Sequence, residues 1–188
     1  TNQINIWTGR TTKEYKGLNP GRYIQLKNSD FSKLSNEYAD YIEYKSSNYM
    51  IWRALVNYGK ESNNYRIWGS LPDYQFIENS DIVEGRFINE SDVNNSSKVA
   101  VIGNKVKLDL FKSEDPLGKY VSVYGINFKV IGVYTDPGGE DEESQIYIPL
   151  TTAQKSFNGG DRINNMSYTI KMPENFFYPR RMKCKFPI

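Results

Sequence analysis

One stretch of the chain has the spacing of an amphipathic helix. It begins at the polar cluster Asn28-Ser29-Asp30, whose short side chains can accept hydrogen bonds from the free N–H groups at a helix start. Apolar residues then recur every three or four positions, at Phe31, Leu34, Tyr38, Tyr41 and Ile42. This spacing places them on one stripe, so we expect the helix to lay that face on a sheet.

Apolar and aromatic runs between polar turns predict strands on both sides of this helix. A strand before the helix and a hairpin after it would form a β-α-β unit, with GKESNN as the bridge of the hairpin. Pro72 should open a short helical turn in PDYQFIEN, because the N–H that proline lacks is free at that position anyway. The predicted strands are Ile4–Trp7, Arg22–Leu26, Tyr49–Tyr58 and Tyr65–Leu71.

Shorter elements follow residue 85. The apolar run VAVIG at 99–103 predicts a strand, and the next residues, NKVKLDLF, predict a short helix with Val106, Leu110 and Phe111 on one side. Strands at 120–124 and 128–134 should pair through a tight turn at 125–127. The pattern ends with an acidic loop, DPGGEDEES, a strand, QIYIP, a brief helix, TTAQKSF, a turn, NGGDR, and a last strand, NMSYTIKM.

Several of these segments, in this order, resemble one protein family. They are GRF at 85–87, VAVIG at 99–103, LF at 110–111, DPLGK at 115–119, Gly125, FKVIGVY at 128–134 and IPLTTA at 148–153. The string resembles the periplasmic core domain of MacB-type, FtsX-like ABC-transporter permeases. The IWTGRTT and GRYIQL segments near the start match that family more loosely.

The resemblance implies an α+β fold in two parts: a porter-like β-α-β part and an inserted mixed β/α part called the sabre. On this template residues 1–84 are the first porter-like segment, and residues 85–162 are the sabre-like insertion. Residues 163–188 return to the porter-like part, which looks incomplete because no second helix and strand follow. The start at Thr1 without Met fits an excised piece of a longer protein and a mature processed domain equally well. The resemblance implies the first, a piece cut from a longer permease.

The residues that carry the resemblance are typical of a scaffold. Asp115-Pro116-Leu117-Gly118 should form a turn, in which Asp holds the backbone, Pro fixes φ and Gly accepts a positive φ. Gly132 interrupts an apolar strand, which indicates close approach of a neighbouring backbone. We expect Arg86 to donate to backbone carbonyls rather than to bind a ligand.

Composition and charge remove most other functions. The 188 residues include no His and only Cys184, so the commonest general base, a thiolate zinc site and an intrachain disulfide are all excluded. The net charge of +2 gives no electrostatic case for nucleic acid, although residues 171–188 hold five basic residues and one acidic residue. No window approaches the roughly 20 apolar residues of a membrane-spanning helix, and no phosphate-binding GxxxxGK[ST] loop occurs.

Two clusters remain as candidate sites. Asp136, Glu140, Asp141, Glu142 and Glu143 offer the oxygen ligands that calcium favours, but their spacing matches no calcium loop. We therefore expect a solvated loop whose loss leaves folding nearly unchanged. An aromatic platform could form from Trp7, Trp52, Trp68, Tyr49, Tyr58, Tyr65 and Tyr74.

Strict alternation in the strand 49–58 would place Ile51, Arg53 and Leu55 on one face and Trp52, Ala54 and Val56 on the other. Both faces then carry apolar groups, which favours burial of one Trp and interface use of another over a dedicated ligand groove. We nominate no catalytic, cofactor-binding or metal-binding residue.

The favoured hypothesis is a non-catalytic domain of an ABC-transporter permease. The resemblance places it on the periplasmic side of the bacterial inner membrane, between flanking transmembrane helices. It would relay ATP-driven movement (mechanotransmission) from an ABC ATPase domain or subunit to substrate or to a periplasmic adaptor or lipoprotein, with the permease acting as a dimer. The alternative is an extracytoplasmic binding module for a lipid, lipoprotein or peptide. An enzyme that uses the acidic loop with a cation is a third, weaker hypothesis.

Overall fold

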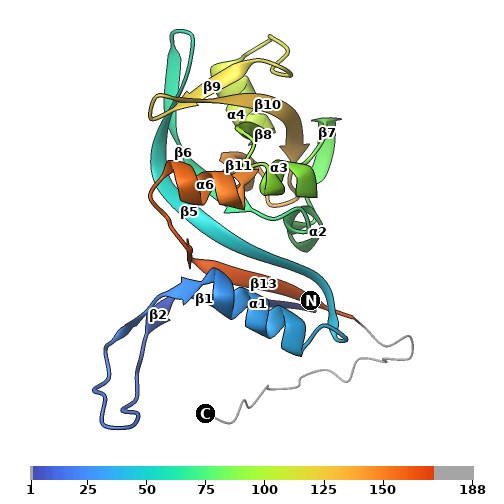
Figure 1. The fold of residues 1–188 in the computed structure, drawn as a ribbon. Helices are drawn as coiled ribbons and strands as arrows, with labels where there is room; N and C mark the ends of the chain where they lie inside the picture. Colours follow the sequence, from blue (N-terminus) through green and yellow to red (C-terminus); the bar gives the residue numbers. More distant parts are fainter. Residues whose placement is uncertain (1, 172–188) are drawn as a thin grey trace.

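A single long strand, β5 (Ile42–Tyr58), runs through both parts of the molecule (Figure 1). In the computed structural model, which describes residues 2–171, the first half of β5 pairs with β13 (Asn165–Ile170). Strand β13 pairs in turn with β1 (Gln3–Trp7). The second half of β5 pairs with β6 (Glu61–Ser70) on one edge and with β9 (Tyr120–Val123) on the other.

Six strands close into a ring. From β6 the pairing continues to β11 (Gln145–Pro149), β8 (Val99–Gly103) and β10 (Ile126–Thr135). Strand β10 pairs with β9, which returns to β5 and closes the circle. Strand β7 (Asp81–Gly85) pairs with the far end of β10. We call these six strands, together with β7 and the helices packed on them, the ring part.

The ring part has an apolar core to which every one of its six strands contributes. Alternate residues such as Ile146 and Ile148 point into this core, where α4 (Asn104–Leu110) adds Val106 and α6 (Leu150–Ser156) adds Ala153. A second cluster, on the outer face, packs Trp68 and Tyr147 under α2 (Tyr74–Glu78) and α3 (Glu90–Asn94).

The α1 part is a smaller layer of helix on sheet. Here α1 (Asn28–Glu37) covers β1, β13 and the first half of β5 over an apolar cluster that includes Phe31, Leu34 and Met166. This cluster also takes in Leu150 of α6, so it reaches the ring part. Two short ribbons complete this part: β4 (Leu26–Lys27) with β12 (Arg162–Ile163), and β2 (Gly9–Arg10) with β3 (Tyr23–Ile24).

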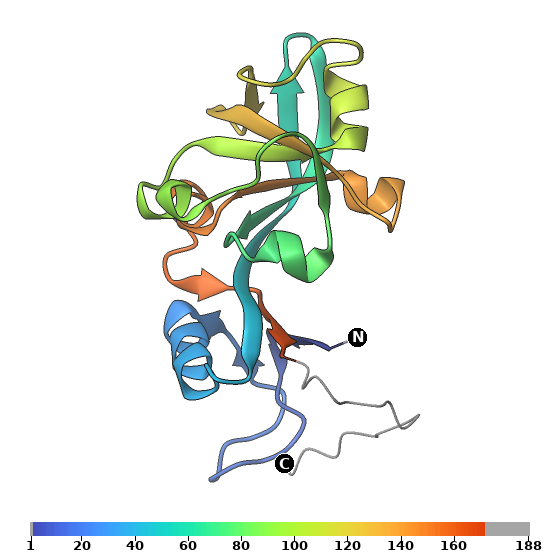
Figure 2. The same cartoon turned by 90° about the vertical axis from the view of Figure 1, so that its right-hand side faces the viewer.

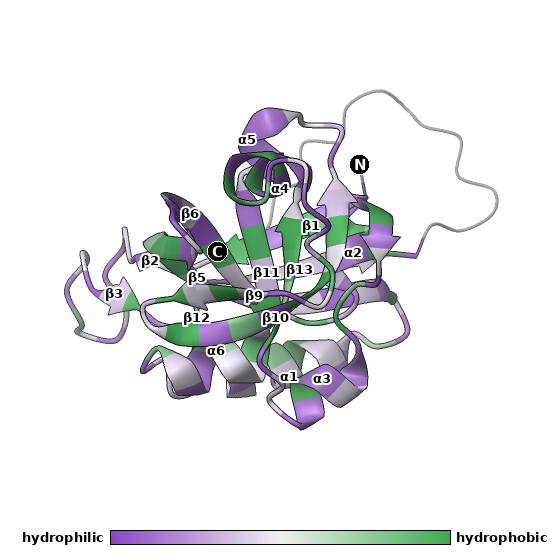
Figure 3. Cartoon of the chain, turned by 90° about the horizontal axis from the view of Figure 1, so that it is seen from above, coloured by the Kyte–Doolittle hydropathy of each residue, from purple (hydrophilic) through white to green (hydrophobic). Residues whose placement is uncertain are grey.

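The helices lie on two sides of the strands. Figures 2 and 3 show α1, α3 and α6 on one side, and α4 with α5 (Glu140–Glu143) on the other. Figure 3 also shows the hydrophobic residues concentrated in the strands between them. Among residues 2–171, no helix is long and apolar enough to cross a bilayer.

Many of the expected elements are confirmed, and so is the α+β class. VAVIG forms β8, Tyr120–Val123 and Ile126–Thr135 form a hairpin, and the predicted brief helices are α2, α4 and α6. Val106, Leu110 and Phe111 are all buried, as the spacing predicted. The prediction for the basic tail beyond Lys171, including an incomplete porter-like end, concerns residues outside the described range.

The predicted stripe of α1 is wrong at its end. The helix stops at Glu37, Tyr41 is exposed, and Ile42 already belongs to β5. The cause is sheet pairing, because Ile42 lies opposite Ile170 and the Tyr41 carbonyl accepts from the Lys171 N–H at 2.9 Å. Pairing with β13 thus takes the residues that would have made one more helical turn.

Strict alternation also fails in β5. Between Ile51 and Ala54 the register against β6 shifts, with Arg53 at φ +47°. This β-bulge adds one residue, so Ile51 packs against the same core as Ala54 and Val56, while Trp52 is exposed. The sequence carries no glycine or asparagine at Arg53 that would have marked the bulge.

Candidate functional site at the joint between the two parts

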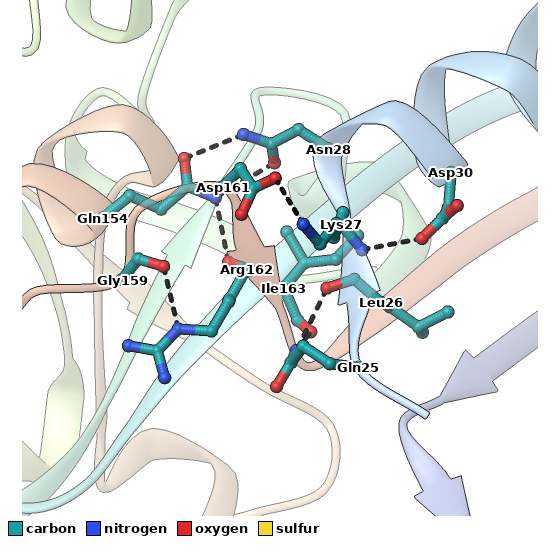
Figure 4. Close-up of polar contacts among 10 residues, drawn as sticks. All are labelled: Gln25, Leu26, Lys27, Asn28, Asp30, Gln154, Gly159, Asp161, Arg162 and Ile163. Atoms are coloured by element: carbon teal, nitrogen blue, oxygen red, sulfur yellow. Dashed lines mark hydrogen bonds and ion pairs between the residues drawn. The ribbon is translucent and has the colours of Figure 1, made fainter. Parts of the chain in front are cut away.

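Polar contacts join the start of α1 to the chain that leaves the ring part (Figure 4). Leu26 and Lys27 pair with Ile163 and Arg162 in the β4–β12 ribbon. The Asn28 N–H donates to the Asp161 carbonyl at 2.9 Å, and Lys27 Nζ lies 3.3 Å from Asp161 Oδ2. This ion pair is more than half exposed and therefore adds little to stability.

Side-chain amides form the centre of the joint (Figure 4). Asn28 and Gln154 exchange two hydrogen bonds, of 3.2 and 3.0 Å, and Gln154 Nε2 also donates to the Arg162 carbonyl at 2.9 Å. Gln25 Nε2 donates to the Ile163 carbonyl at 2.8 Å. Helix α6 of the ring part is thus tied to the start of α1 by amides.

The expected helix start is corrected in one respect. Asp30 accepts from the Lys27 N–H at 2.9 Å, as a residue of the predicted polar cluster should. Asn28, however, is the first residue of the helix and turns its side chain to Gln154. The sequence pattern assigned this side chain to capping, whereas it serves the joint.

A second set of bonds crosses at Asn164. Its backbone N–H donates to the Asn48 carbonyl at 2.7 Å, and its Oδ1 accepts from the Met50 N–H at 2.8 Å. Its carbonyl accepts from the Thr8 N–H at 2.9 Å. Gly159, in the turn that precedes β12, has no room for a side chain, since a Cβ would lie 3.0 Å from the Tyr49 ring.

A layer of small polar side chains lies buried near this crossing. Its members are fully or almost fully buried, and we call them the polar seam: Ser46, Asn48, Ser70, Asn165 and Ser167. The register sets Asn48 opposite Asn165 and Ser46 opposite Ser167, so these four share one face of the sheet.

The seam is incompletely hydrogen-bonded. Ser46 Oγ donates to Asn48 Oδ1 at 3.1 Å, and Asn165 Nδ2 donates to Ser167 Oγ at 3.2 Å. Asn48 Nδ2, Asn165 Oδ1 and Ser70 Oγ have no partner among the described residues. Buried polar atoms without partners destabilise the contact between the two parts. Burying this face therefore stabilises the contact less than burying an apolar face of equal area would.

The same face of the α1 part meets the ring part through a few mixed contacts. Trp7 packs edge-on against Trp68 with ring centres 6.3 Å apart, and Tyr44 stacks on Phe76 at 4.9 Å. Gln3 Nε2 donates to Glu78 Oε1 at 3.4 Å. Each contact joins β1 or β5 to β6 or α2, across the boundary between the two parts.

Glu78 is the titratable group of this boundary. Burial raises the pKa of Glu78, and the nearby carboxylates of Glu142 and Asp136 raise it further, while hydrogen bonds with Tyr74 and Gln3 oppose the rise. The ionised form of Glu78 is therefore disfavoured in the folded protein.

The acidic loop is partly helical and touches the core. Glu140–Glu143 form α5, and no group of three potential ligands in residues 2–171 is placed to hold a metal ion. The Tyr134 hydroxyl donates to the Glu142 carbonyl at 2.7 Å. A Cβ on Gly103 would lie 1.9 Å from the Glu143 carbonyl oxygen, so the two backbones are in contact. Glu142 is exposed and Glu143 is half-buried, so the loop is solvated as expected, while its backbone contacts Tyr134 and Gly103.

The three tryptophans do not converge on one groove. Trp68 is buried in the outer cluster, whereas Trp7 and Trp52 are 53% and 63% exposed at separate places. Two open hollows of about 410 and 310 Å³ are lined by other residues, among them Tyr58 with Phe111 and Tyr44 with Phe76. These hollows give the predicted tryptophan groove no support.

Scaffold roles account for the other residues singled out. Asp115 accepts from the Leu117 N–H at 2.9 Å and Gly118 has φ +77°, which is the expected turn. A Cβ on Gly132 would lie 2.2 Å from the Arg86 carbonyl oxygen, which confirms close backbone approach. Arg86 donates to the Phe87 carbonyl at 2.9 Å and also makes a two-pronged pair with Asp92, at 2.6 and 3.1 Å.

The family model of the MacB-like periplasmic core domain matches residues 1–175. The chain belongs to this family. A macrolide export ATP-binding/permease protein MacB of Aggregatibacter actinomycetemcomitans is 32% identical over 180 residues, or 93% of this chain and 27% of that protein. A pyoverdine export ATP-binding/permease protein PvdT of Pseudomonas syringae pv. syringae is 38% identical over 82 residues, 41% of this chain and 12% of that protein. The chain thus spans about a quarter or less of these relatives.

Solved structures agree with this membership. The periplasmic region of MacB from Actinobacillus actinomycetemcomitans superposes with a TM-score of 0.77 at 29% identity, covering 94% of this chain and 77% of that one. The extracellular domain of the ABC-type transporter YknZ from Gram-positive bacteria has a TM-score of 0.75 at 21% identity, with 91% and 84% covered, and shows the shared fold.

Sequence reasoning missed the joint almost entirely. Its members are Asn, Gln, Ser and backbone groups, which the pattern assigned to turns and caps. The available signal was the run SSN at 46–48, a polar interruption at the head of an apolar strand. In the structure this run lies at mid-length of β5, because the strand begins at Ile42. A polar stretch in the middle of a long strand indicates that the strand changes its packing partner there.

Proposed function

We propose that this chain is a non-catalytic extracytoplasmic domain of an ABC-transporter permease that relays ATP-driven conformational change to substrate or partner proteins. The observation that carries the proposal is the joint: two parts meet across a polar seam and amide contacts, and their apolar clusters are linked through Leu150 of α6 and Tyr49.

Physical chemistry links such a boundary to motion. Interfaces between parts of one chain that are small and polar allow relative movement, whereas a continuous apolar core does not. A relay needs blocks that stay rigid and a few residues that absorb the change between them. The ring part, whose six strands each pair with two neighbours around an apolar core, supplies a rigid block.

The proposal includes placement and partners. The domain would lie on the periplasmic side of the bacterial inner membrane, held by flanking transmembrane helices and acting with an ABC ATPase domain or subunit. Two similarities support this placement: the relatives are ATP-binding/permease proteins, and the similar solved structure is the periplasmic region of MacB. A permease dimer and a periplasmic adaptor or lipoprotein complete the proposed assembly.

The division into parts is also a proposal. We keep a porter-like part and a sabre-like insertion, and the strand pairing favours assigning β6 and β7 to the insertion, since both belong to the ring part. The first boundary then falls inside β5 near Asn48 rather than at residue 84, and the second near residue 162.

Hydrogen exchange of single backbone amides tests the joint. We expect the N–H groups of Asn28 and Asn164, which donate across the joint, to exchange through local opening, at lower cost than the ring amides of β8 and β11. Gln154→Ala should speed exchange at those two amides by roughly tenfold while leaving the ring unchanged.

The matched control is Lys155→Ala, the next residue of α6, whose side chain reaches Ser96 and not the joint. It should leave joint exchange unaltered. If the joint and ring amides exchange at one common rate, set by global unfolding in all three proteins, the two parts form one rigid body and the proposed relay fails.

A further inference from the structure

The ribbon from Gly9 to Ile24 stands away from the rest of the molecule. Apart from Thr11, every residue in it is exposed, and none belongs to an apolar cluster. Its own backbone holds it together, through Thr11 N–H to the Arg22 carbonyl at 2.9 Å and Gly21 N–H to the Thr11 carbonyl at 2.7 Å. Within the described chain this ribbon therefore has no packing partner. A lone two-stranded hairpin is only marginally stable in water, so a surface that packs against it would stabilise it.

The ribbon displays two kinds of side chain. Four large apolar residues are between 44% and 63% exposed: Tyr15, Leu18, Tyr23 and Ile24. Four basic residues accompany a single acidic one, Glu14, for a net charge of +3: Arg10, Lys13, Lys16 and Arg22. Lys16 and Tyr15 lie together at the tip, with Lys16 Nζ 5.3 Å from the Tyr15 ring centre, while Tyr15 and Leu18 pair as an isolated bridge.

The position of the ribbon indicates what it faces. It belongs to the α1 part and extends away from the ring part in both side views (Figures 1 and 2). The two ends of the described chain leave the same part, because Asn2 and Ile170 are joined by hydrogen bonds of 2.7 and 3.0 Å. A membrane anchor attached to either end would therefore hold the α1 part nearest the bilayer.

We propose that the tip of this ribbon is a membrane-contact surface that binds anionic phospholipid headgroups. Lysine and arginine attract the anionic surface, while tyrosine and leucine bury their apolar bodies at the boundary between headgroups and acyl chains. The +3 charge and the exposed Tyr15 and Leu18 match this chemistry better than that of an uncharged protein surface. The inference does not depend on movement at the joint, so it can fail while the relay stands.

Vesicle sedimentation of the full chain tests this surface. We expect binding to phosphatidylcholine vesicles that contain phosphatidylglycerol, and much weaker binding to pure phosphatidylcholine. Lys13→Glu with Lys16→Glu should weaken binding to the anionic vesicles by about tenfold or more, because each basic residue near an anionic surface contributes substantially. Tyr15→Ser with Leu18→Ser should weaken binding to both kinds of vesicle.

Matched controls distinguish an effect of the ribbon from a general effect of lost charge or lost apolar surface. Lys98→Glu with Lys155→Glu makes the same charge change on the ring part, and Leu108→Ser with Tyr120→Ser removes exposed apolar groups there. Both control pairs should retain at least most of the binding. The basic residues of 171–188 are present in every variant, so they contribute equally to each comparison.

Three outcomes would overturn the proposal. They are the absence of binding to anionic vesicles, ribbon variants that bind as the unchanged chain does, and control pairs that lose as much binding as the ribbon pairs. Circular dichroism should show all variants folded, since every substituted residue is exposed or half-buried.

Discussion

Arg86 illustrates how a residue typical of the family string acts through structure. Asp92 is buried, with its side chain only 8% exposed, and it receives two hydrogen bonds from Arg86 and one from the Asn89 N–H. Burial alone would raise the pKa of Asp92, but these donors more than offset it and hold the pKa below its ordinary value. Arg86 thus allows a carboxylate to remain charged beneath the surface beside β7.

Removing the guanidinium should be costly at neutral pH. We expect Arg86→Ala to lower the free energy of unfolding by about 1–3 kcal/mol, because the Asp92 carboxylate then loses its charged donor. Since the folded pKa of Asp92 is depressed, its contribution is present above the ordinary value of 3.8 and is lost as the pH falls through the folded pKa. The difference between the two proteins should therefore shrink below pH 3.8.

Chemical denaturation at neutral and acid pH measures this difference. Lys112→Ala is the control, since its pair with Glu61 is exposed, and it should change stability by no more than about 0.5 kcal/mol. Equal losses for the two variants would contradict the assigned role of Arg86.

The stability contribution of Glu78 depends on pH in the opposite direction to that of Asp92. Its folded pKa is raised, so its favourable contribution is full below the ordinary value of 4.5 and is lost as the pH rises through the folded pKa. Glu78→Gln stays neutral and can still accept from Gln3, so the variant should be more stable than the unchanged chain at pH 7. Melting curves should show the gain fading as the pH falls from the folded pKa of Glu78 towards 4.5; a gain that is constant with pH would exclude the titration of Glu78 as its cause.

At the scale of elements, α5 ties the acidic loop to the ring part. Replacing Glu140–Glu143 by a Gly/Ser linker of equal length removes the Glu142 carboxylate, which accepts from the amide of the buried Gln145. Loss of α5 should also shift the backbone carbonyl of position 142 away from the Tyr134 hydroxyl. We expect a loss of about 1–3 kcal/mol, the cost of a buried polar group without its partner.

The control for α5 is Asp141→Asn, a change of one exposed charge that should leave the melting temperature nearly unchanged. A replaced loop that melts like the control would restore the interpretation of a free, solvated loop.

The elements also show which parts of the fold local sequence patterns predict and why the other parts could not be predicted. Strand β8 was predictable from its continuous apolar run, and the β9–β10 hairpin from two short strand patterns on either side of a turn at Gly125. The first half of β5, from Ile42 to Asn48, was missed because its residues are polar and its strand state comes from pairing with β13, more than a hundred residues away. The Arg53 bulge and the Asn28–Gln154 contact likewise depend on distant partners, and local patterns do not contain them.

In the molecule taken together, two bodies share one strand, β5. The ring part closes on itself, and the α1 part holds both ends of the described chain. A force applied at those ends would reach the ring part through β5, the polar seam and the amide joint. The seam lowers the cost of separation because its buried Asn48, Asn165 and Ser70 atoms gain partners when water enters.

The most direct test is a distance between the two parts in the intact parent protein in a membrane. Spin labels at Lys33→Cys on α1 and Leu108→Cys on α4, with Cys184→Ser, report across the joint, while Leu108→Cys with Lys155→Cys reports within the ring part. The distance between the two parts should change between the nucleotide-free and ATP-bound states, while the distance within the ring part stays constant. Identical distance distributions across the joint in both states would contradict the proposed relay.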